Sequence, residues 1–279
     1  MGGVRRLGYH ISISGSMDLA FDRAREIGCT CMQIFPSNPR GWAVKELGKG
    51  EKEGFRRKGK AYNISPVFVH MPYLPNLASP KEDVYRKSVE AMKTALGRCN
   101  ELGAEYLTVH LGSHLGTGVE AGRERVAAAI NEVERSLGGV TILLENEAGQ
   151  RNSVGSKLDE LVDIYNSVSH KRVGFCLDTC HAFAAGYDIA DRDVAKEVAE
   201  TLGLERIRCI HLNDAKHELG SGLDRHADIG FGRIGRKGFE SFFSVPGLKE
   251  KPMILETPLV ETPKDARGEL AAVRKMLGD

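Results

Sequence analysis

The chain has 279 residues with 41% hydrophobic and 28% charged residues, which are ordinary values for a globular protein and exclude a disordered or fibrous one. Its longest apolar runs, such as residues 140–144, are far shorter than the roughly 20 residues that cross a bilayer, so we expect no membrane partner. The formal net charge is +1, so a nucleic-acid footprint would have to be local. Residues 45–60 and 225–237 are candidate basic patches for binding nucleic acid, although a charged face that only contacts solvent has the same composition.

The first residues lead directly into a strand-like segment and lack the apolar core of a secretory signal. The six cysteines show neither the dense spacing of a disulfide scaffold nor paired CxxC motifs. We therefore expect a cytoplasmic protein whose thiols are free and buried.

Short β-rich runs alternate with segments of helical period along the whole chain. The runs predict eight strands at residues 7–13, 30–36, 66–70, 106–110, 140–146, 173–178, 207–213 and 252–256. The segments between them predict helices at 17–27, after 51, and at 80–102, 119–137, 157–168 and 191–202, with a last helix from 262. Ser79 to Glu82 reads as a capping box with proline at the first helical position, and Thr262-Pro263 starts the last helix in the same way.

Eight strand-helix units typically need about 250 residues, and no linker or low-complexity tract divides this chain. We therefore predict one domain over residues 1–279, a (β/α)8 or TIM barrel with its active site at the C-terminal ends of the strands. An open doubly wound sheet is the alternative. Such a sheet usually carries its ligand at one switch point, whereas polar residues end nearly every strand here.

These polar strand ends form the candidate site, because the C-terminal ends of barrel strands converge on one face. A single histidine at a strand end is more often a hydrogen-bonding residue than a ligand, but the repetition along the chain indicates a shared site. The residues at strand ends are His10, His70, His110, Glu145, Asp178, His211 and Glu256. The loops add His181, Asp224 and His226.

Histidine and carboxylate ligands suit Zn²⁺ or Mn²⁺, and this set exceeds the three or four ligands that one zinc requires, so more than one metal is expected. A carboxylate such as Glu145 can bridge two ions. Closely spaced metals stabilise both the attacking and the leaving oxygen of a phosphoester hydrolysis, which is therefore the leading reaction. Cys176 and Cys180 are poor rivals as ligands because they flank Asp178 in a predicted buried strand end.

Several longer motifs resemble the endonuclease IV family, and they follow one another in order from His10 to Glu256. The motifs are HMPYLPNL at 70–77, CLDTCHAFAAGYD at 176–188, HLNDAK at 211–216, DRH at 224–226, GFGRIG at 230–235 and ILETP at 254–258. One of them is more than ten residues long, so the signal is far more specific than a short glycine motif.

The resemblance implies a site of three zinc ions, with Mn²⁺ possible at some positions. The family's ligand pattern falls on His70, His110 and Glu145 for one ion, with Glu145 bridging to a second ion held by Asp178, His211 and Glu256. The same pattern gives His181, Asp224 and His226 to the third ion.

The resemblance also implies a function in DNA repair. The expected reaction is hydrolysis of the phosphodiester 5′ to an abasic site in double-stranded DNA, leaving a 3′-hydroxyl and a 5′-deoxyribose phosphate, with trimming of blocked 3′ ends as a second activity. Glu145 would be the catalytic residue that helps to place the attacking hydroxide. By the same resemblance Arg40, Tyr73 and Leu74 would contact DNA and fill the stack that an extruded abasic nucleotide leaves, and the protein would act as a monomer.

The chain departs from the family pattern in its loops. The family commonly has threonine where Glu147 stands and glycine where Arg151 stands, so we expect Glu147 to repel DNA phosphates and Arg151 to attract them. It also favours proline at Leu111 and lysine at Ser37. None of these changes affects a predicted ligand.

Two other functions remain open. A metal-dependent sugar isomerase on the same kind of barrel also places carboxylates and histidines around two metals, but it gives no reason for a third group at His181, Asp224 and His226. A DNA-binding or scaffold protein with structural metals is the other alternative, although closed structural zinc sites favour cysteine over carboxylate ligands.

Overall fold

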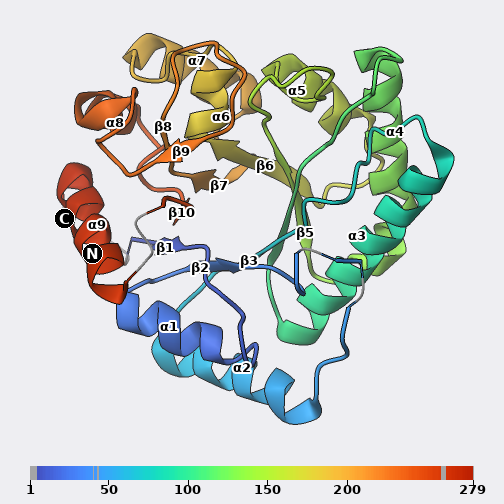
Figure 1. Ribbon diagram of the computed structural model, residues 1–279, viewed down its shortest axis with the longest axis horizontal. Helices are drawn as coiled ribbons and strands as arrows, with labels where there is room; N and C mark the ends of the chain where they lie inside the picture. The colour runs from blue at the N-terminus through green and yellow to red at the C-terminus, as the bar shows by residue number, and fades with distance from the viewer. Residues whose placement is uncertain (1–4, 40, 43, 259–261, 279) are drawn as a thin grey trace.

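The computed structural model describes residues 5–39, 41–42, 44–258 and 262–278 (Figure 1). Eight parallel strands form one sheet in the order β1-β10-β7-β6-β5-β4-β3-β2. The strands are β1 (Leu7–Tyr9), β2 (Met32–Ile34), β3 (Val67–His70), β4 (Tyr106–Val109), β5 (Thr141–Glu145), β6 (Val173–Asp178), β7 (Ile207–His211) and β10 (Met253–Leu255). Each lies within one of the eight predicted runs, and most are shorter at their ends.

The two edge strands of this order, β1 and β2, meet and nearly close the barrel. His10 pairs with Gln33 in an isolated parallel bridge, and the Ile11 amide donates to the Gln33 carbonyl at 2.7 Å. At the other end of the pair the Thr30 amide donates to the Leu7 carbonyl at 2.9 Å. The predicted TIM barrel is therefore confirmed, and the open doubly wound sheet is not the observed architecture.

Helices surround the strands on the outside of the barrel (Figure 1). They are α1 (Leu19–Ile27), α2 (Lys49–Tyr62), α3 (Glu82–Leu102), α4 (Val119–Glu132), α5 (Leu158–Ser167), α7 (Arg192–Leu202), α8 (Gly235–Phe243) and α9 (Pro263–Leu277). A six-residue helix, α6 (Thr179–Ala184), follows β6 directly, and a two-stranded hairpin, β8 (Asp214–Ala215) with β9 (His226–Ala227), follows β7.

The start of helix α3 differs from prediction in its capping. The predicted capping box at Ser79 is wrong, because α3 begins at Glu82 with Lys81 as an N-cap that makes no side-chain hydrogen bond. The Ser79 hydroxyl instead accepts from the Lys81 amide in a turn before the helix. At α9 the prediction is confirmed, since the Thr262 side chain accepts from the Asp265 amide at 3.2 Å. Helix α4 ends at Glu132 and is followed by a 3₁₀ turn at Glu134–Ser136, short of the predicted end at 137.

An apolar layer inside the barrel forms the floor of the site. Side chains alternate along a strand, so the residue two positions before a site residue faces the same interior. The buried members of this layer are Cys31, Phe68, Leu143, Cys176, Cys209 and Ile254. Each precedes by two positions a polar residue at the C-terminal mouth. All six cysteines of the chain are buried and free, as predicted, and no helix of the described residues is long and apolar enough to span a membrane.

Gly8 permits the close approach of β1 to β2. A Cβ at this position would lie 1.9 Å from the Cys31 carbonyl oxygen and 2.8 Å from its carbon, and backbone atoms cannot rotate away as a flexible side chain would. The sequence therefore needs glycine where the barrel closes.

We predict that Gly8→Ala lowers the free energy of unfolding by about 1–3 kcal/mol, because the strands must separate to admit the methyl group. Gly97→Ala in α3 is the matched control. It meets no atom within 4 Å and should leave stability unchanged or raise it, since alanine favours the helix. Urea unfolding of both variants measures the difference, and equal effects would contradict the role of Gly8.

Candidate metal centre

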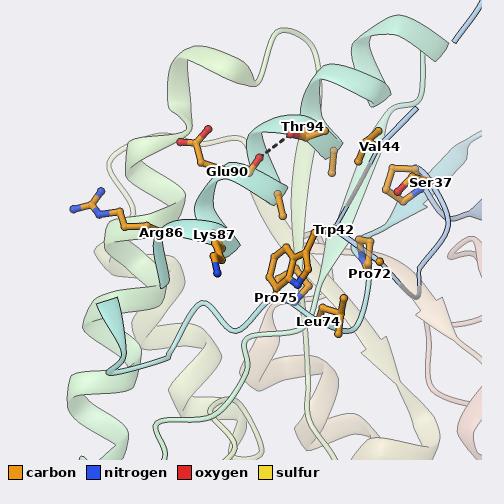
Figure 2. A pocket seen from close by; sticks show the side chains of 14 residues that line it. Ser37, Trp42, Val44, Pro72, Leu74, Pro75, Arg86, Lys87, Glu90 and Thr94 are labelled. Atoms are coloured by element: carbon orange, nitrogen blue, oxygen red, sulfur yellow. Dashed lines mark hydrogen bonds between the residues drawn. The ribbon is translucent and has the colours of Figure 1, made fainter. Parts of the chain in front are cut away.

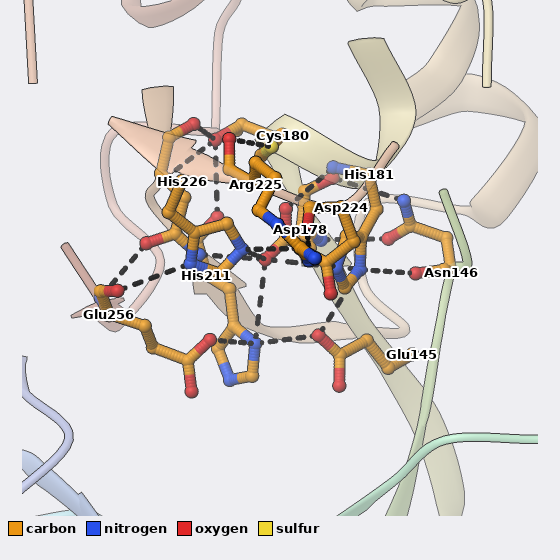
Figure 3. Close-up of polar contacts among 12 residues, drawn as sticks. Glu145, Asn146, Asp178, Cys180, His181, His211, Asp224, Arg225, His226 and Glu256 are labelled. Atoms are coloured by element: carbon orange, nitrogen blue, oxygen red, sulfur yellow. Dashed lines mark hydrogen bonds and ion pairs between the residues drawn. The ribbon is translucent and has the colours of Figure 1, made fainter. Parts of the chain in front are cut away.

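The predicted ligands lie together at the C-terminal mouth of the barrel, and Figure 3 shows those from Glu145 to Glu256. Four of them are the last residues of strands: His70 of β3, Glu145 of β5, Asp178 of β6 and His211 of β7. Two follow a strand directly, His110 after β4 and Glu256 after β10. His181 lies in α6, and Asp224 and His226 belong to the β8–β9 hairpin. The structure therefore brings all nine residues into one site.

Glu145 lies at the centre of this site and is 1% exposed. One of its oxygens, Oε2, is 3.0 Å from His70 Nε2 and 3.7 Å from His110 Nε2. The other, Oε1, is 2.8 Å from His211 Nδ1. The two carboxylate oxygens thus face different histidines, which is the arrangement that a bridging carboxylate requires.

Asp178, His211 and Glu256 form a second group around the far side of Glu145. His211 Nδ1 is 3.5 Å from Glu256 Oε2 and 3.9 Å from Asp178 Oδ2, and it is fully buried. A third group lies at the mouth, where Asp224 Oδ1 is 3.3 Å from His181 Nε2 and 3.2 Å from His226 Nε2. Asp178 Oδ2 lies 3.8 Å from His226 Nε2 and so links the second and third groups.

The donor atoms fit divalent metal ions. The atoms of His70, His110 and Glu145 lie within 4.8 Å of one another, and so do those of His181, Asp224 and His226. His226 Nε2 is buried, and although Asp224 Oδ1 lies 3.2 Å away, no hydrogen bond of good geometry reaches this nitrogen within the described part of the chain. A buried ring nitrogen without a partner is costly unless a ligand completes it. Because His226 Nε2 faces the carboxylates of Asp224 and Asp178, a metal ion bound between these groups would complete it.

The electrostatics of the site also favour cations. Burial alone would lower the pKa of His110, but the charges of Glu145 and Glu147 outweigh it and raise that pKa to about 9. Burial likewise opposes protonation of His226, yet the contact with Asp224 and the charge of Asp178 raise its pKa to about 9. The carboxylates therefore dominate the field at the mouth, and positive charge is stabilised there.

Residues that the sequence did not single out hold the ligands in place. Gln33 is fully buried, and its Oε1 lies 2.9 Å from His211 Nε2 while its Nε2 donates to Glu256 Oε1 at 2.7 Å. The Asn213 side chain donates to Asp178 Oδ2 at 2.8 Å and accepts from the Glu256 amide at 2.9 Å. Such supports orient ligands and affect metal affinity strongly. The only sequence signal for them is a polar residue inside an otherwise apolar strand segment.

His10, also proposed from its strand end, lies at the edge of the centre. Its Nδ1 is 3.3 Å from Glu256 Oε1 and 3.0 Å from Gln33 Nε2. The structure therefore places His10 beside a predicted ligand, where it supports Glu256 together with Gln33.

Tyr73, one of the three residues predicted to fill the vacated stack (the wedge residues), lies over the metal centre. The Tyr73 side chain is 69% exposed, and its ring centroid lies 5.5 Å from that of Phe35 and 6.5 Å from that of His70. Leu74 beside it is 43% exposed. Tyr73 lines the cavity of about 320 Å³ over the ligands. Arg40 lies outside the described residues.

A larger cavity of about 580 Å³ lies beside the wedge, between the segment after β2 and helix α3 (Figure 2). Trp42, Leu74 and Pro75 form much of its apolar wall, and Lys87 and Glu90 of α3 line its other side. Among the described residues, its lining contains no group of histidines and carboxylates. The metal centre is therefore the stronger candidate for chemistry, although its cavity is smaller.

Comparison with known proteins identifies the family. The family model described as "Xylose isomerase-like TIM barrel" matches residues 21–276. A protein of Methanoculleus marisnigri named "Probable endonuclease 4" is 50% identical, over 98% of this chain and 99% of its own length. The chain belongs to the endonuclease IV family.

Solved structures agree with this membership. The crystal structure of endonuclease IV from Thermus thermophilus superposes with a TM-score of 0.86 at 35% identity, covering 98% of this chain and 99% of that one. A D-tagatose 3-epimerase-like protein also matches, with a TM-score of 0.75 at 20% identity over 98% of this chain and 97% of that one. At that identity the match shows a shared fold alone, so the donor groups must distinguish the endonuclease IV family from sugar-converting barrels.

Proposed function

We propose that this protein is an apurinic/apyrimidinic endonuclease, which hydrolyses the phosphodiester 5′ to an abasic site and leaves a 3′-hydroxyl and a 5′-deoxyribose phosphate. The observation that carries the proposal is the placement of Glu145, which is buried with one oxygen toward His70 and His110 and the other toward His211. Tyr73 lines the same cavity as His70 and His110. The names of relatives in the endonuclease IV family support the same reaction. Trimming of blocked 3′ ends is proposed as a second activity of the same site.

Three Zn²⁺ ions are proposed as the cofactors, with Mn²⁺ able to replace some of them. His70, His110 and Glu145 would hold one ion, and Glu145, Asp178, His211 and Glu256 the second. His181, Asp224 and His226 would hold the third. The donor atoms of the first and third groups lie within 4.8 Å of one another, and His226 Nε2 is buried. For the second ion the support is His211 Nδ1, which lies 2.8 Å from Glu145 Oε1, 3.5 Å from Glu256 Oε2 and 3.9 Å from Asp178 Oδ2. When bound, zinc lowers the pKa of coordinated water to about 7 and so supplies hydroxide at neutral pH.

The side chains of the site would do the remaining work. Glu145 directs its two oxygens toward different histidines and would help to place the attacking hydroxide. Asp178 and Glu256 are held by Asn213 and Gln33, which keeps the charges in place during the reaction. A preorganised site of this kind stabilises the charge that develops on the phosphate without reorganising.

Selectivity would come from the residues above the site. An abasic nucleotide has lost its stacking and pairing, so turning it out of the duplex avoids the few kcal/mol that an intact nucleotide costs. Tyr73 and Leu74 are exposed beside the cavity and could fill the vacated stack. A sugar isomerase has no use for such residues or for the third donor group, so the nuclease is favoured over it.

The DNA surface is proposed to extend onto the loop that follows the β8–β9 hairpin. Asp214 is fully buried and accepts hydrogen bonds from the amides of Gly230, Gly232 and Ile234 at 2.9–3.0 Å, which fixes the loop. Phe231 at its tip is 85% exposed, although burial would be favourable for an aromatic side chain. Double-stranded DNA with an abasic site or a blocked 3′ end is the proposed partner, and the protein is proposed to act as a monomer.

We predict that Glu145→Gln keeps the fold but loses cleavage by on the order of 10²–10³-fold or more, because the bridging charge disappears with little change in volume. Circular dichroism checks the fold, and cleavage of an abasic duplex measures the loss. Glu240→Gln on α8 is the control, since Glu240 is exposed and pairs only with Arg236 in its neighbourhood. Full activity of Glu145→Gln would remove it from the mechanism.

We predict that Tyr73→Ala weakens incision of an abasic duplex by about tenfold, the effect of losing one aromatic stacking contact. Trimming of a 3′ end needs no filled stack and should fall less. Tyr73→Phe keeps the ring and serves as the control. Equal losses of Tyr73→Ala in both assays would argue against the wedge.

A further inference from the structure

Glu147 departs from the family pattern and lies next to the metal centre, two residues after Glu145. Its side chain is 14% exposed and turns inward. Oε1 lies 3.1 Å from His110 Nδ1 and accepts from the Leu111 amide at 3.2 Å. The Glu147 amide donates to the Gly155 carbonyl at 3.0 Å, so the backbone of the loop is also fixed at this point. The carboxylate therefore contacts His110 and the Leu111 amide, whereas its sequence context had suggested a group that repels DNA phosphates.

Each histidine ligand has one ring nitrogen toward the proposed metal and one away from it. The contact on the nitrogen away from the metal differs between His110 and the other histidine ligands. Three of them use Nδ1 to donate to a backbone carbonyl, and one faces a side-chain amide. The pairs are His70 with Met71 O at 2.7 Å, His181 with Asn146 O at 2.9 Å, His226 with Glu256 O at 3.2 Å and His211 Nε2 with Gln33 Oε1 at 2.9 Å. Among these five ligands only His110 has a carboxylate at hydrogen-bond distance on the side away from the proposed metal, because the Glu145 oxygen near His181 Nδ1 lies farther off at 3.6 Å.

His110 is also the least buried of the five. Its side chain is 25% exposed, against 16% for His226 and 4% or less for the other three. Packing therefore holds it less firmly than it holds its neighbours. A ring in this position needs a directional partner to keep Nε2 pointed at Glu145.

We propose that Glu147 is a positioning residue for the metal centre. Its carboxylate accepts the Nδ1 proton of His110, which fixes the tautomer whose Nε2 lone pair faces the metal and holds the ring in place. The segment after β5 thus supplies both the bridging ligand, Glu145, and the support of a neighbouring ligand. This inference rests on the proposed metal centre and deepens it.

The test compares Glu147→Ala with Glu147→Gln in the zinc-loaded protein, using Zn²⁺ removal by a chromophoric chelator and elemental analysis of the metal retained. Glu147→Ala should hold Zn²⁺ at the affected position about 10–100-fold more weakly. Glu147→Gln should recover part of this loss, because its amide oxygen can still accept from Nδ1. Gln150→Ala is the control, since Gln150 is exposed on the same loop and should leave retention unchanged.

Two results would overturn the proposal. One is a Glu147→Ala protein that retains Zn²⁺ as the wild type does. The other is a Glu147→Gln protein that loses as much as Glu147→Ala, because glutamine keeps both the volume and the accepting oxygen that the proposal relies on. The readout is separate from cleavage. A wild-type protein that binds Zn²⁺ but does not cut abasic DNA would refute the proposed nuclease, while the chelator comparison would still decide the role of Glu147.

Discussion

The structure depends on the burial of one carboxylate, that of Glu145, at the end of a central barrel strand. A buried charge is very unfavourable unless it is paired and hydrogen-bonded. Here His70 and His211 lie at hydrogen-bond distance from its two oxygens, with His110 slightly farther away. Those histidines in turn need fixed partners on their other nitrogens. Gln33 is such a partner for His211, and Glu147 is one for His110.

Barrel closure makes this arrangement possible. The interior positions alternate along each strand, so an apolar residue such as Leu143 faces the floor and Glu145, two positions later, faces the mouth. The same relation joins Phe68 to His70 and Cys209 to His211. Closing β1 against β2 through Gly8 then directs these strand ends toward one centre. The fold is shared with sugar-converting enzymes, so the identity of the mouth residues, and not the barrel, decides between the functions.

Much of this architecture is predictable from the sequence because its signals are local. Every barrel strand except β2 is a short, mostly apolar run that ends in a polar site residue or is followed directly by one. The structure brings all nine predicted ligands together. The errors have physical reasons. Helix α8 (Gly235–Phe243) was not predicted because it starts with glycine and contains a second one, both poor helix formers. At α3 the Ser79 hydroxyl closes a turn before the helix, where a capping box had been expected.

The supports of the ligands could not be predicted in the same way. Gln33 lies within an apolar strand, and its partners His211 and Glu256 are far from it in sequence. Glu147 has an ordinary loop context, in which a carboxylate near DNA suggests repulsion. Only the three-dimensional structure shows that it contacts His110 instead. Contacts of this kind depend on the register between strands, which a single sequence does not display.

The central claim is that this mouth binds metal ions and uses them to cut DNA beside an abasic site. The most direct measurement is incision of a duplex oligonucleotide with one abasic-site analogue, before and after metal stripping and after zinc is restored. The account predicts a cut 5′ to the analogue that disappears on stripping and returns with zinc. Absence of cleavage in every metal state would contradict it.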